Sequence, residues 1–271
     1  MSERGWIVPI GGAEEKLRNP RILKRFAEVA GGPHARIAVV PTASRMPDTG
    51  PRYVKLFRKD LGVAEARTLD FQTRADCEAP ELLDFLREAT GVFFTGGNQL
   101  RLSTTLGGTP VTEIIRQRNR EEGLDVAGTS AGASFLSEHM IAYGNEGPTP
   151  RADMVSLAPG MGLTEEIVVD QHFAQRDRLG RLLAALAYNP RPIGIGLDED
   201  TAAFIDPEEG LEVVGSGAIT IVDPSDMEFS SMDSARPHEP VTVIGVRLHV
   251  LAEGAGFDIP SRRARLPAAA G

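Results

Sequence analysis

Short apolar segments alternate with amphipathic segments along the first half of this 271-residue chain. The apolar segments, which are typical of strands, cover residues 6–10, 36–44, 65–71, 91–97 and 124–130. Segments with apolar residues at helical spacing lie between them, at 14–30, 53–61, 80–89 and 110–122. Pro20 is expected to start or interrupt the helix over 14–30. Buried strands that alternate with helices indicate a mostly parallel sheet with helices on both faces. We therefore predict an α/β fold.

The second half of the chain has a different pattern. A strand over 166–173 and a helix over 175–188 are predicted first. Short strands then follow one another closely and suggest antiparallel additions at the sheet edge, over 193–197, 201–206, 211–215, 218–223 and 241–251. We expect a single domain over residues 1–271, with 258–271 as a loosely ordered tail.

Composition limits the functions that are open to this chain. A net charge of −9 argues against nucleic acid or an anionic membrane as the main partner. Cys77 is the only cysteine, which excludes an internal disulfide and a cysteine-based zinc cluster. The segment MSERGWIVPI lacks a long apolar signal, and no run of about 18 apolar residues occurs. These two features lead us to expect a cytoplasmic protein. We expect no metal or organic cofactor, because H-E-x-x-H, G-x-G-x-x-G and P-loop motifs are absent.

The segment GTSAG at residues 128–132 fits G-x-S-x-G, the pattern of a nucleophilic serine on a strained turn between a strand and a helix. The neighbours of such a serine must be small, and here they are Gly128, Ala131, Gly132 and Ala133. An apolar strand precedes Ser130, and a helix can begin directly after it. We therefore predict Ser130 as a nucleophile; the alternative is an ordinary polar turn of small residues.

A serine hydroxyl needs a base, and the chain contains five histidines. His172 ends the apolar strand 166–173, so in a parallel sheet it lies at the same edge as Ser130. The other histidines lie just beyond the helix after Ser130, in turns or loops, or in a late strand: His139, His34, His238 and His249. We predict His172 as the base, whereas an esterase of the α/β-hydrolase type would use His238 or His249.

A carboxylate is expected to orient His172. The chain order serine, acid, histidine is frequent among enzymes with this serine motif. That order leaves six acids, which are Glu138, Glu146, Asp153, Glu165, Glu166 and Asp170. Glu146 lies in a loop after an expected strand, and Asp170 shares a strand face with His172. The sequence pattern alone does not choose between these two.

Backbone N–H groups are expected to stabilise the oxyanion of an acyl-transfer reaction. Ala131 follows the nucleophile and supplies one such group. The pair Gly96 and Gly97 ends the strand 91–97 and can supply another, because glycine permits a close approach of the backbone.

Five segments, in this order along the chain, resemble the cyanophycinase family of serine peptidases, which is related to aspartyl dipeptidase (dipeptidase E). They are PIGGAEEK at 9–16, FTGGNQLRLS at 94–103, GTSAGAS at 128–134, DQHFAQRDRLGRL at 170–182 and GIGLDEDTA at 194–202. The resemblance extends from about residue 7 to about residue 222. It implies a flavodoxin-like fold of the class I glutamine amidotransferase type, and it suggests a homodimer.

The resemblance also implies roles for individual residues. It makes Ser130 the nucleophile, His172 the base, Glu146 the third member of the triad, and Gly97 and Ala131 the oxyanion donors. It places six further side chains along the substrate cleft, which are Gln99, Asp170, Gln171, Arg176, Arg178 and Arg181.

The family's substrate is cyanophycin, a poly-aspartate with an arginine attached to each side chain through an isopeptide bond. An exopeptidase of this kind releases β-Asp-Arg dipeptides through an acyl-enzyme. Each repeat carries a guanidinium and a carboxylate, so a binding site needs both acids and arginines. Arginines surround His172, and the acids of 198–200 follow another strand, where we expect them to meet the guanidinium.

Two other functions are compatible with the sequence. One is an aspartyl or isoaspartyl dipeptidase that uses the same chemistry on short peptides. The other is a binding module for arginine-rich polymer in which Ser130 does not react.

Overall fold

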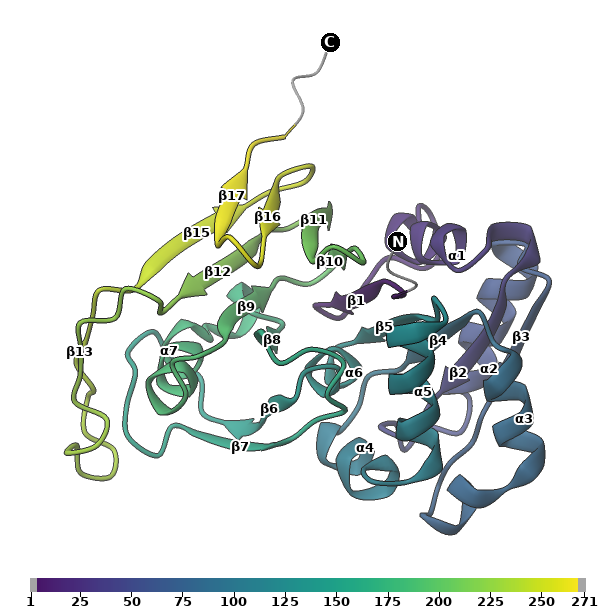
Figure 1. The fold of residues 1–271 in the computed structure, drawn as a ribbon, viewed down its shortest axis with the longest axis horizontal. Coiled ribbons are helices and arrows are strands. Elements are labelled where there is room, and N and C mark those ends of the chain that lie inside the picture. Colours follow the sequence, from purple (N-terminus) through teal and green to yellow (C-terminus); the bar gives the residue numbers. More distant parts are fainter. Residues whose placement is uncertain (1–3, 268–271) are drawn as a thin grey trace.

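The computed structural model describes residues 4–267. A nine-stranded sheet forms its centre, in the order β17-β16-β11-β10-β1-β5-β4-β2-β3 (Figure 1). Five neighbouring strands from the first half of the chain run parallel: β1 (Ile7–Ile10), β2 (Arg36–Val40), β3 (Glu65–Thr68), β4 (Gly91–Phe94) and β5 (Asp125–Thr129). Four strands of the second half extend the sheet in antiparallel fashion: β10 (Thr201–Ile205), β11 (Gly210–Gly215), β16 (Gly256–Asp258) and β17 (Arg263–Arg265).

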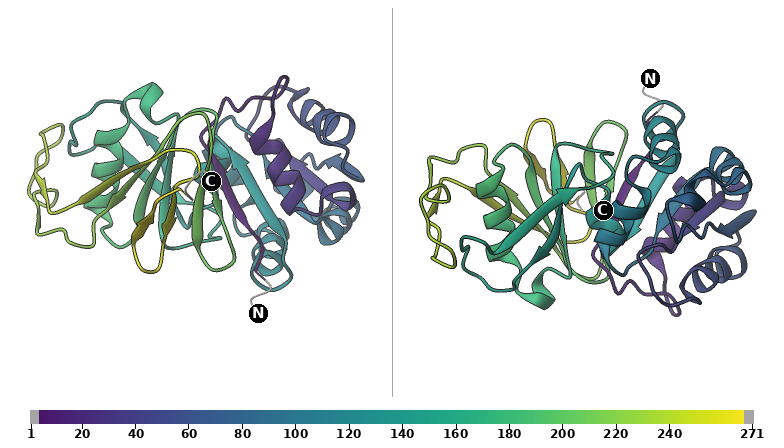
Figure 2. Two further views of the ribbon diagram at one scale, coloured as in Figure 1. Left: turned by 90° about the horizontal axis from the view of Figure 1, so that it is seen from above. Right: turned by 90° about the horizontal axis from the view of Figure 1, so that it is seen from below.

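Helices cover both faces of the parallel strands (Figure 2). One face packs against α1 (Arg21–Val29) and α2 (Thr49–Lys55). The other packs against α3 (Pro80–Glu88), α4 (Gln99–Leu106), α5 (Pro110–Glu121) and α6 (Ala131–Phe135). In β4, Phe93 joins the first core, whereas Val92 and Phe94 join the second, because side chains alternate along a strand. The predicted α/β fold is confirmed.

A second sheet of four strands carries the rest of the second half, in the order β15-β12-β9-β8. Its strands are β8 (Ile167–Gln171), β9 (Ile193–Leu197), β12 (Ile219–Asp223) and β15 (Arg247–Leu251). Only β8 and β9 run parallel, and α7 (Leu179–Tyr188) connects them. The sequence pattern predicted one sheet, so the strand that precedes His172 belongs to a different sheet from the one expected.

Smaller elements complete the chain. Two strand pairs lie outside the main sheets: β6 (His139–Gly144) with β7 (Val155–Pro159), and β13 (Phe229–Ser230) with β14 (Val243–Ile244). Short helical turns are η1 (Gly32–His34), η2 (Leu56–Asp60), η3 (Ala75–Glu78) and η4 (Ala174–Arg176). No helix within residues 4–267 is long and apolar enough to cross a membrane.

The structure differs from two further expectations. The helix expected over 14–30 begins only at Arg21, because Pro20 favours the start of a helix and not its interior. Residues 14–19 therefore form a loop. The tail expected over 258–271 is partly ordered, because Arg263–Arg265 pairs with Gly256–Asp258; residues 268–271 lie outside the described part.

Asp125, at the start of β5, links the pH of the solution to the stability of the fold. The side chain is 5% exposed and accepts a hydrogen bond from the N–H of Trp6 at 2.7 Å. Burial raises the pKa of Asp125 to about 7, and that hydrogen bond opposes the shift. Between pH of about 4, the pKa of an unfolded Asp, and pH of about 7, the folded chain holds a proton that the unfolded chain loses. Stability therefore falls as the pH rises through this range.

The variant D125N removes this ionisation and keeps an acceptor for Trp6. We expect it to raise the melting temperature more at pH 8 than at pH 4, as measured by differential scanning calorimetry. The exposed Asp233 provides the control variant D233N, whose effect should not change with pH in this way. An equal effect of D125N at both pH values would contradict this view of Asp125.

Candidate active site

Ser130 and His172 meet where strands of the two sheets end. Ser130 follows β5, and its N–H donates to the carbonyl of Ile10 at 2.9 Å. His172 follows β8, and its N–H donates to the carbonyl of Gly11 at 2.9 Å. The end of β1 thus accepts a hydrogen bond from each residue and joins the two sheets at this point.

The turn at Ser130 is strained and tightly packed. Its backbone has φ 53° and ψ −113°, a combination that residues other than glycine rarely adopt. A Cβ on Gly128 would lie 2.4 Å from the backbone of Gly132, and a Cβ on Gly132 would lie 2.5 Å from the carbonyl oxygen of Phe94. Both glycines of the motif are therefore required by the packing of α6 against β5 and β4.

A row of hydrogen bonds runs from Ser130 through His172 to Glu199. Ser130 Oγ lies 2.9 Å from His172 Nε2, and His172 Nδ1 lies 2.6 Å from Glu199 Oε1. An ionised carboxylate only accepts hydrogen bonds, so Nδ1 carries the proton and donates it to Glu199. Nε2 is then free to accept the proton of the serine hydroxyl, as a general base must.

Glu199 therefore occupies the place that we expected for Glu146 or Asp170. It lies in the turn between β9 and β10, where we had predicted a ligand for the substrate guanidinium. It comes after His172 in the chain, so the order serine, acid, histidine excluded it. The turn itself is fixed, because the N–H of Glu199 donates to Gln175 at 3.0 Å.

The surroundings of His172 favour its neutral form. Burial lowers the pKa of His172, the positive charges of Arg176 and Arg178 lower it further, and the hydrogen bond to Glu199 opposes these effects. Gly12 makes room for the ring, because a Cβ there would lie 2.5 Å from Cε1 of His172. A neutral imidazole at neutral pH is the state in which His172 can accept a proton.

Asp170 and Arg181 form a buried ion pair. Asp170 has no exposed surface, Arg181 is 4% exposed, and the Nε of Arg181 donates to Asp170 at 2.6 Å. Their charges are thus neutralised inside the fold and do not face a cleft, which differs from the role in substrate binding that we expected. The reason is that both lie on the inner side of the contact between α7 and β8.

Arg178 and Glu146 lie next to this pair. Arg178 is 5% exposed, and it donates to the carbonyl of Gln171 at 2.5 Å and to its Oε1 at 3.1 Å. Its Nε is buried without a partner in residues 4–267. Burial lowers the pKa of Arg178 to about 10, and the charge of Arg181 adds to this shift. Glu146 lies 3.7 Å from Arg178, so its carboxylate faces an arginine and not the ring of His172.

The remaining residues that we predicted for substrate binding have different surroundings. Gln171 is 5% exposed, and its Oε1 lies 3.5 Å from Ser130 Oγ. Arg176 is exposed on η4. Gln99, at the start of α4, donates to the carbonyls of Ile141 and Ala142 and so ties this helix to β6.

Two backbone N–H groups near Ser130 are available to donate hydrogen bonds to an anion. Within residues 4–267, neither Gly97 nor Ala131 donates its N–H to an acceptor of the chain. The glycine turn lies against Ser130, because a Cβ on Gly96 would lie 3.8 Å from Ser130 Oγ. Gly97 has φ 147°, and a Cβ there would lie 2.1 Å from the carbonyl oxygen of Ala43, so no other residue fits.

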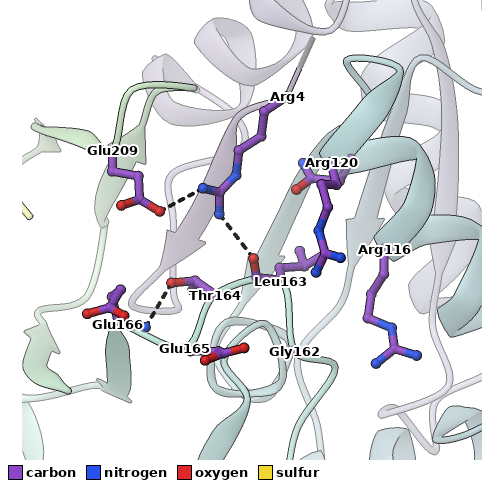
Figure 3. A pocket seen from close by; sticks show the side chains of 10 residues that line it. Arg4, Arg116, Arg120, Gly162, Leu163, Thr164, Glu165, Glu166 and Glu209 are labelled. Atoms are coloured by element: carbon purple, nitrogen blue, oxygen red, sulfur yellow. Dashed lines mark hydrogen bonds and ion pairs between the residues drawn. The ribbon is translucent and has the colours of Figure 1, made fainter. Parts of the chain in front are cut away.

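A pocket of about 220 Å³ lies at the opposite edge of the sheet, near the amino ends of β1, β5 and β8 (Figure 3). Arg116 and Arg120 of α5 point toward the loop 162–166, and Arg4 donates to Glu209. The residues that line this pocket do not include Ser130, His172 or Glu199. Residues 4–267 contain no group of three or more His, Cys, Asp or Glu side chains that could hold a metal ion.

Comparison with known proteins decides the family. The profile described as "Peptidase family S51" matches residues 7–213. The chain belongs to peptidase family S51. The resemblance that the sequence motifs indicated is thereby confirmed, and so is the prediction of a serine peptidase.

Several known proteins are similar to this chain over nearly its whole length. Cyanophycinase from Trichormus variabilis is 44% identical over 257 residues, which cover 94% of this chain and 86% of that protein. Cyanophycinase from Geminocystis herdmanii is 41% identical over 256 residues, which cover 94% of both chains. The crystal structure of a peptidase from an acI-B1 actinobacterium aligns with a TM-score of 0.64 and 25% identity, over 91% of this chain and 97% of that one.

The position of Glu199 predicts how the pH dependence of kcat/KM changes when its carboxylate is removed. Its hydrogen bond raises the pKa of His172, so E199Q should lower that pKa further and move the acid limb of kcat/KM to lower pH. The kcat should fall by at least about 10²-fold, because the Nδ1–H group of His172 then faces a neutral amide instead of a negatively charged carboxylate. Kinetics between pH 4 and 9 measure both effects.

The variant E146Q is the matched control, since it makes the same change at the acid that we first expected. It should keep kcat within a few-fold and leave the acid limb in place. Loss of kcat in E146Q, with E199Q active, would show that Glu199 does not orient the base.

Proposed function

We propose that this chain is an exopeptidase that degrades cyanophycin to β-Asp-Arg dipeptides through an acyl-enzyme on Ser130. The observation that carries the proposal is the row of contacts Ser130–His172–Glu199, at 2.9 and 2.6 Å. The chain that holds it aligns over 94% of its length with proteins named cyanophycinase, which supports the choice of substrate.

In the first step, Ser130 Oγ attacks the carbonyl carbon of the scissile peptide bond. His172 Nε2 takes the proton from the hydroxyl as the new C–O bond forms, and Glu199 stabilises the imidazolium through its contact with Nδ1. The carbonyl oxygen becomes negative and accepts hydrogen bonds from the N–H groups of Gly97 and Ala131. One such donor is commonly worth about 3 kcal/mol in the transition state.

In the second step, the C–N bond breaks and His172 gives its proton to the leaving amine. A water molecule then attacks the ester carbonyl, and His172 Nε2 accepts a proton from the water. Collapse of this second tetrahedral intermediate releases the dipeptide and returns the proton to Ser130 Oγ.

The side chains around Ser130 suit a zwitterionic substrate. Arg176 is exposed and close enough to His172 to lower its pKa, so it is placed to bind a carboxylate beside the reacting bond. Arg178 has a buried Nε without a partner in the described residues and reaches the nucleophile through Gln171. Gln99 ties α4 to β6 through its amide N–H groups, and we expect its amide oxygen to accept a hydrogen bond from the substrate.

The direct test is S130A, assayed by mass analysis of the products from purified cyanophycin. We expect a loss of at least about 10³-fold in kcat, because the acyl-enzyme cannot form. Ser134 provides the control S134A, since it is a buried serine one helical turn further along α6. S134A should keep activity. Release of β-Asp-Arg by folded S130A would contradict the mechanism.

The products also test the substrate. β-Asp-Arg without longer fragments at early times is the result expected of an exopeptidase. Turnover of short Asp-X peptides with cyanophycin left intact would instead support an aspartyl or isoaspartyl dipeptidase. Binding of the polymer without reaction of Ser130 toward a fluorophosphonate probe would support a binding module. The homodimer and the location in the cytoplasm remain predictions, which light scattering and cell fractionation can test.

A further inference from the structure

Glu14 is a buried carboxylate directly beneath the serine turn. It lies in the loop 11–16 that follows β1, and the residue is 3% exposed. Its Oε2 accepts the hydroxyl proton of Thr129 at 2.6 Å, and its Oε1 accepts that of Tyr53. The ammonium of Lys16 lies 3.1 Å from Oε1. Two hydroxyls and one cation thus surround the carboxylate.

These partners fit an ionised carboxylate. A buried charge is tolerated only when it is paired and hydrogen-bonded, and Lys16 supplies the opposite charge. Burial and the charge of Glu14 raise the pKa of Tyr53, so this residue stays a phenol and donates. Because the carboxylate can only accept, the hydroxyl of Thr129 must also donate, which fixes the rotamer of Thr129.

Thr129 is the residue before the strained nucleophile. It is 3% exposed and ends β5, where it pairs with Ile10 of β1. A backbone in an unfavourable conformation persists only where its surroundings hold it firmly. The hydrogen bond from Thr129 to Glu14 is one of the contacts that hold the approach to Ser130.

The same loop contacts the other two members of the triad. Gly11 accepts a hydrogen bond from the N–H of His172, and Gly12 packs against its ring. The turn that carries Glu199 is held through its neighbour Asp200, whose N–H donates to the carbonyl of Gly12 at 2.8 Å. The Oδ1 of Asp200 in turn accepts from the N–H of Glu15 at 2.9 Å.

We propose that Glu14 is a positioning residue, which holds Ser130 in line with His172 through the hydroxyl of Thr129. This inference rests on the proposed role of Ser130 as the nucleophile. Glu14 does not contact the substrate; it sets the position of the serine turn relative to the loop that carries the base and its acid. Displacement of a reacting group by about 1 Å can cost about 10²-fold in rate.

The test compares T129V with T129S. Valine removes the hydroxyl without a change in shape, whereas serine keeps the hydroxyl. We expect T129V to lower kcat by about 10- to 100-fold with KM within twofold of the native value, and T129S to retain most of the activity. E14Q should behave like T129V, because the amide carries no charge to hold both hydroxyls as donors.

The second readout is the rate at which a fluorophosphonate modifies Ser130. This rate does not depend on cyanophycin, so it tests the role of Glu14 even if the natural substrate is a different one. It should fall in T129V in parallel with kcat. The control T112V removes an equally buried hydroxyl from α5; it should leave the rate of modification unchanged, whatever its effect on the melting temperature.

Native rates of modification in both folded T129V and folded E14Q would overturn the proposal. A rise in KM with an unchanged kcat would also overturn it, because that result would place Glu14 in substrate binding. If E14Q does not fold, T129V and T129S still decide the question, since they leave the buried carboxylate in place.

Discussion

The ring of His172 is the contact on which the site depends, because it bridges two separate sheets. Ser130 comes from the end of β5 in the large sheet, and Glu199 follows β9 in the smaller one. A hydrogen bond on each ring nitrogen fixes the orientation and the tautomer of the imidazole. The two sheets must therefore keep a fixed relation at this point, and the loop after β1 provides it through hydrogen bonds to residues from both.

The charges around the ring act at different distances. Glu199 contacts the imidazole directly and favours its protonated form, while burial and the nearby arginines favour the neutral form. The pair Asp170 and Arg181 lies deeper and has no exposed carboxylate. This arrangement separates a buried structural ion pair from the exposed Arg176, although these residues are close together in the sequence.

The sequence was sufficient to predict the fold class and to select Ser130 and His172, whose side chains the structure brings within 2.9 Å of each other. Ser130 and His172 each follow an apolar strand, and the ends of these strands meet although β5 and β8 belong to different sheets. Glu199 was missed because it lies in a turn between two sheets, and the sequence pattern indicated only one. Glu14 was missed because residues 14–19 have helical periodicity, while its partners Tyr53 and Thr129 are distant in sequence. Contacts between residues that are distant in the sequence depend on tertiary packing, which local sequence patterns do not show.

The most direct test of the account is the proton NMR signal of the Nδ1–H of His172. A proton shared with a carboxylate at 2.6 Å should resonate far downfield and be absent in H172A. This signal should be lost or strongly shifted in E199Q and unchanged in E146Q. A signal that persists in E199Q and disappears in E146Q would contradict the contact between His172 and Glu199.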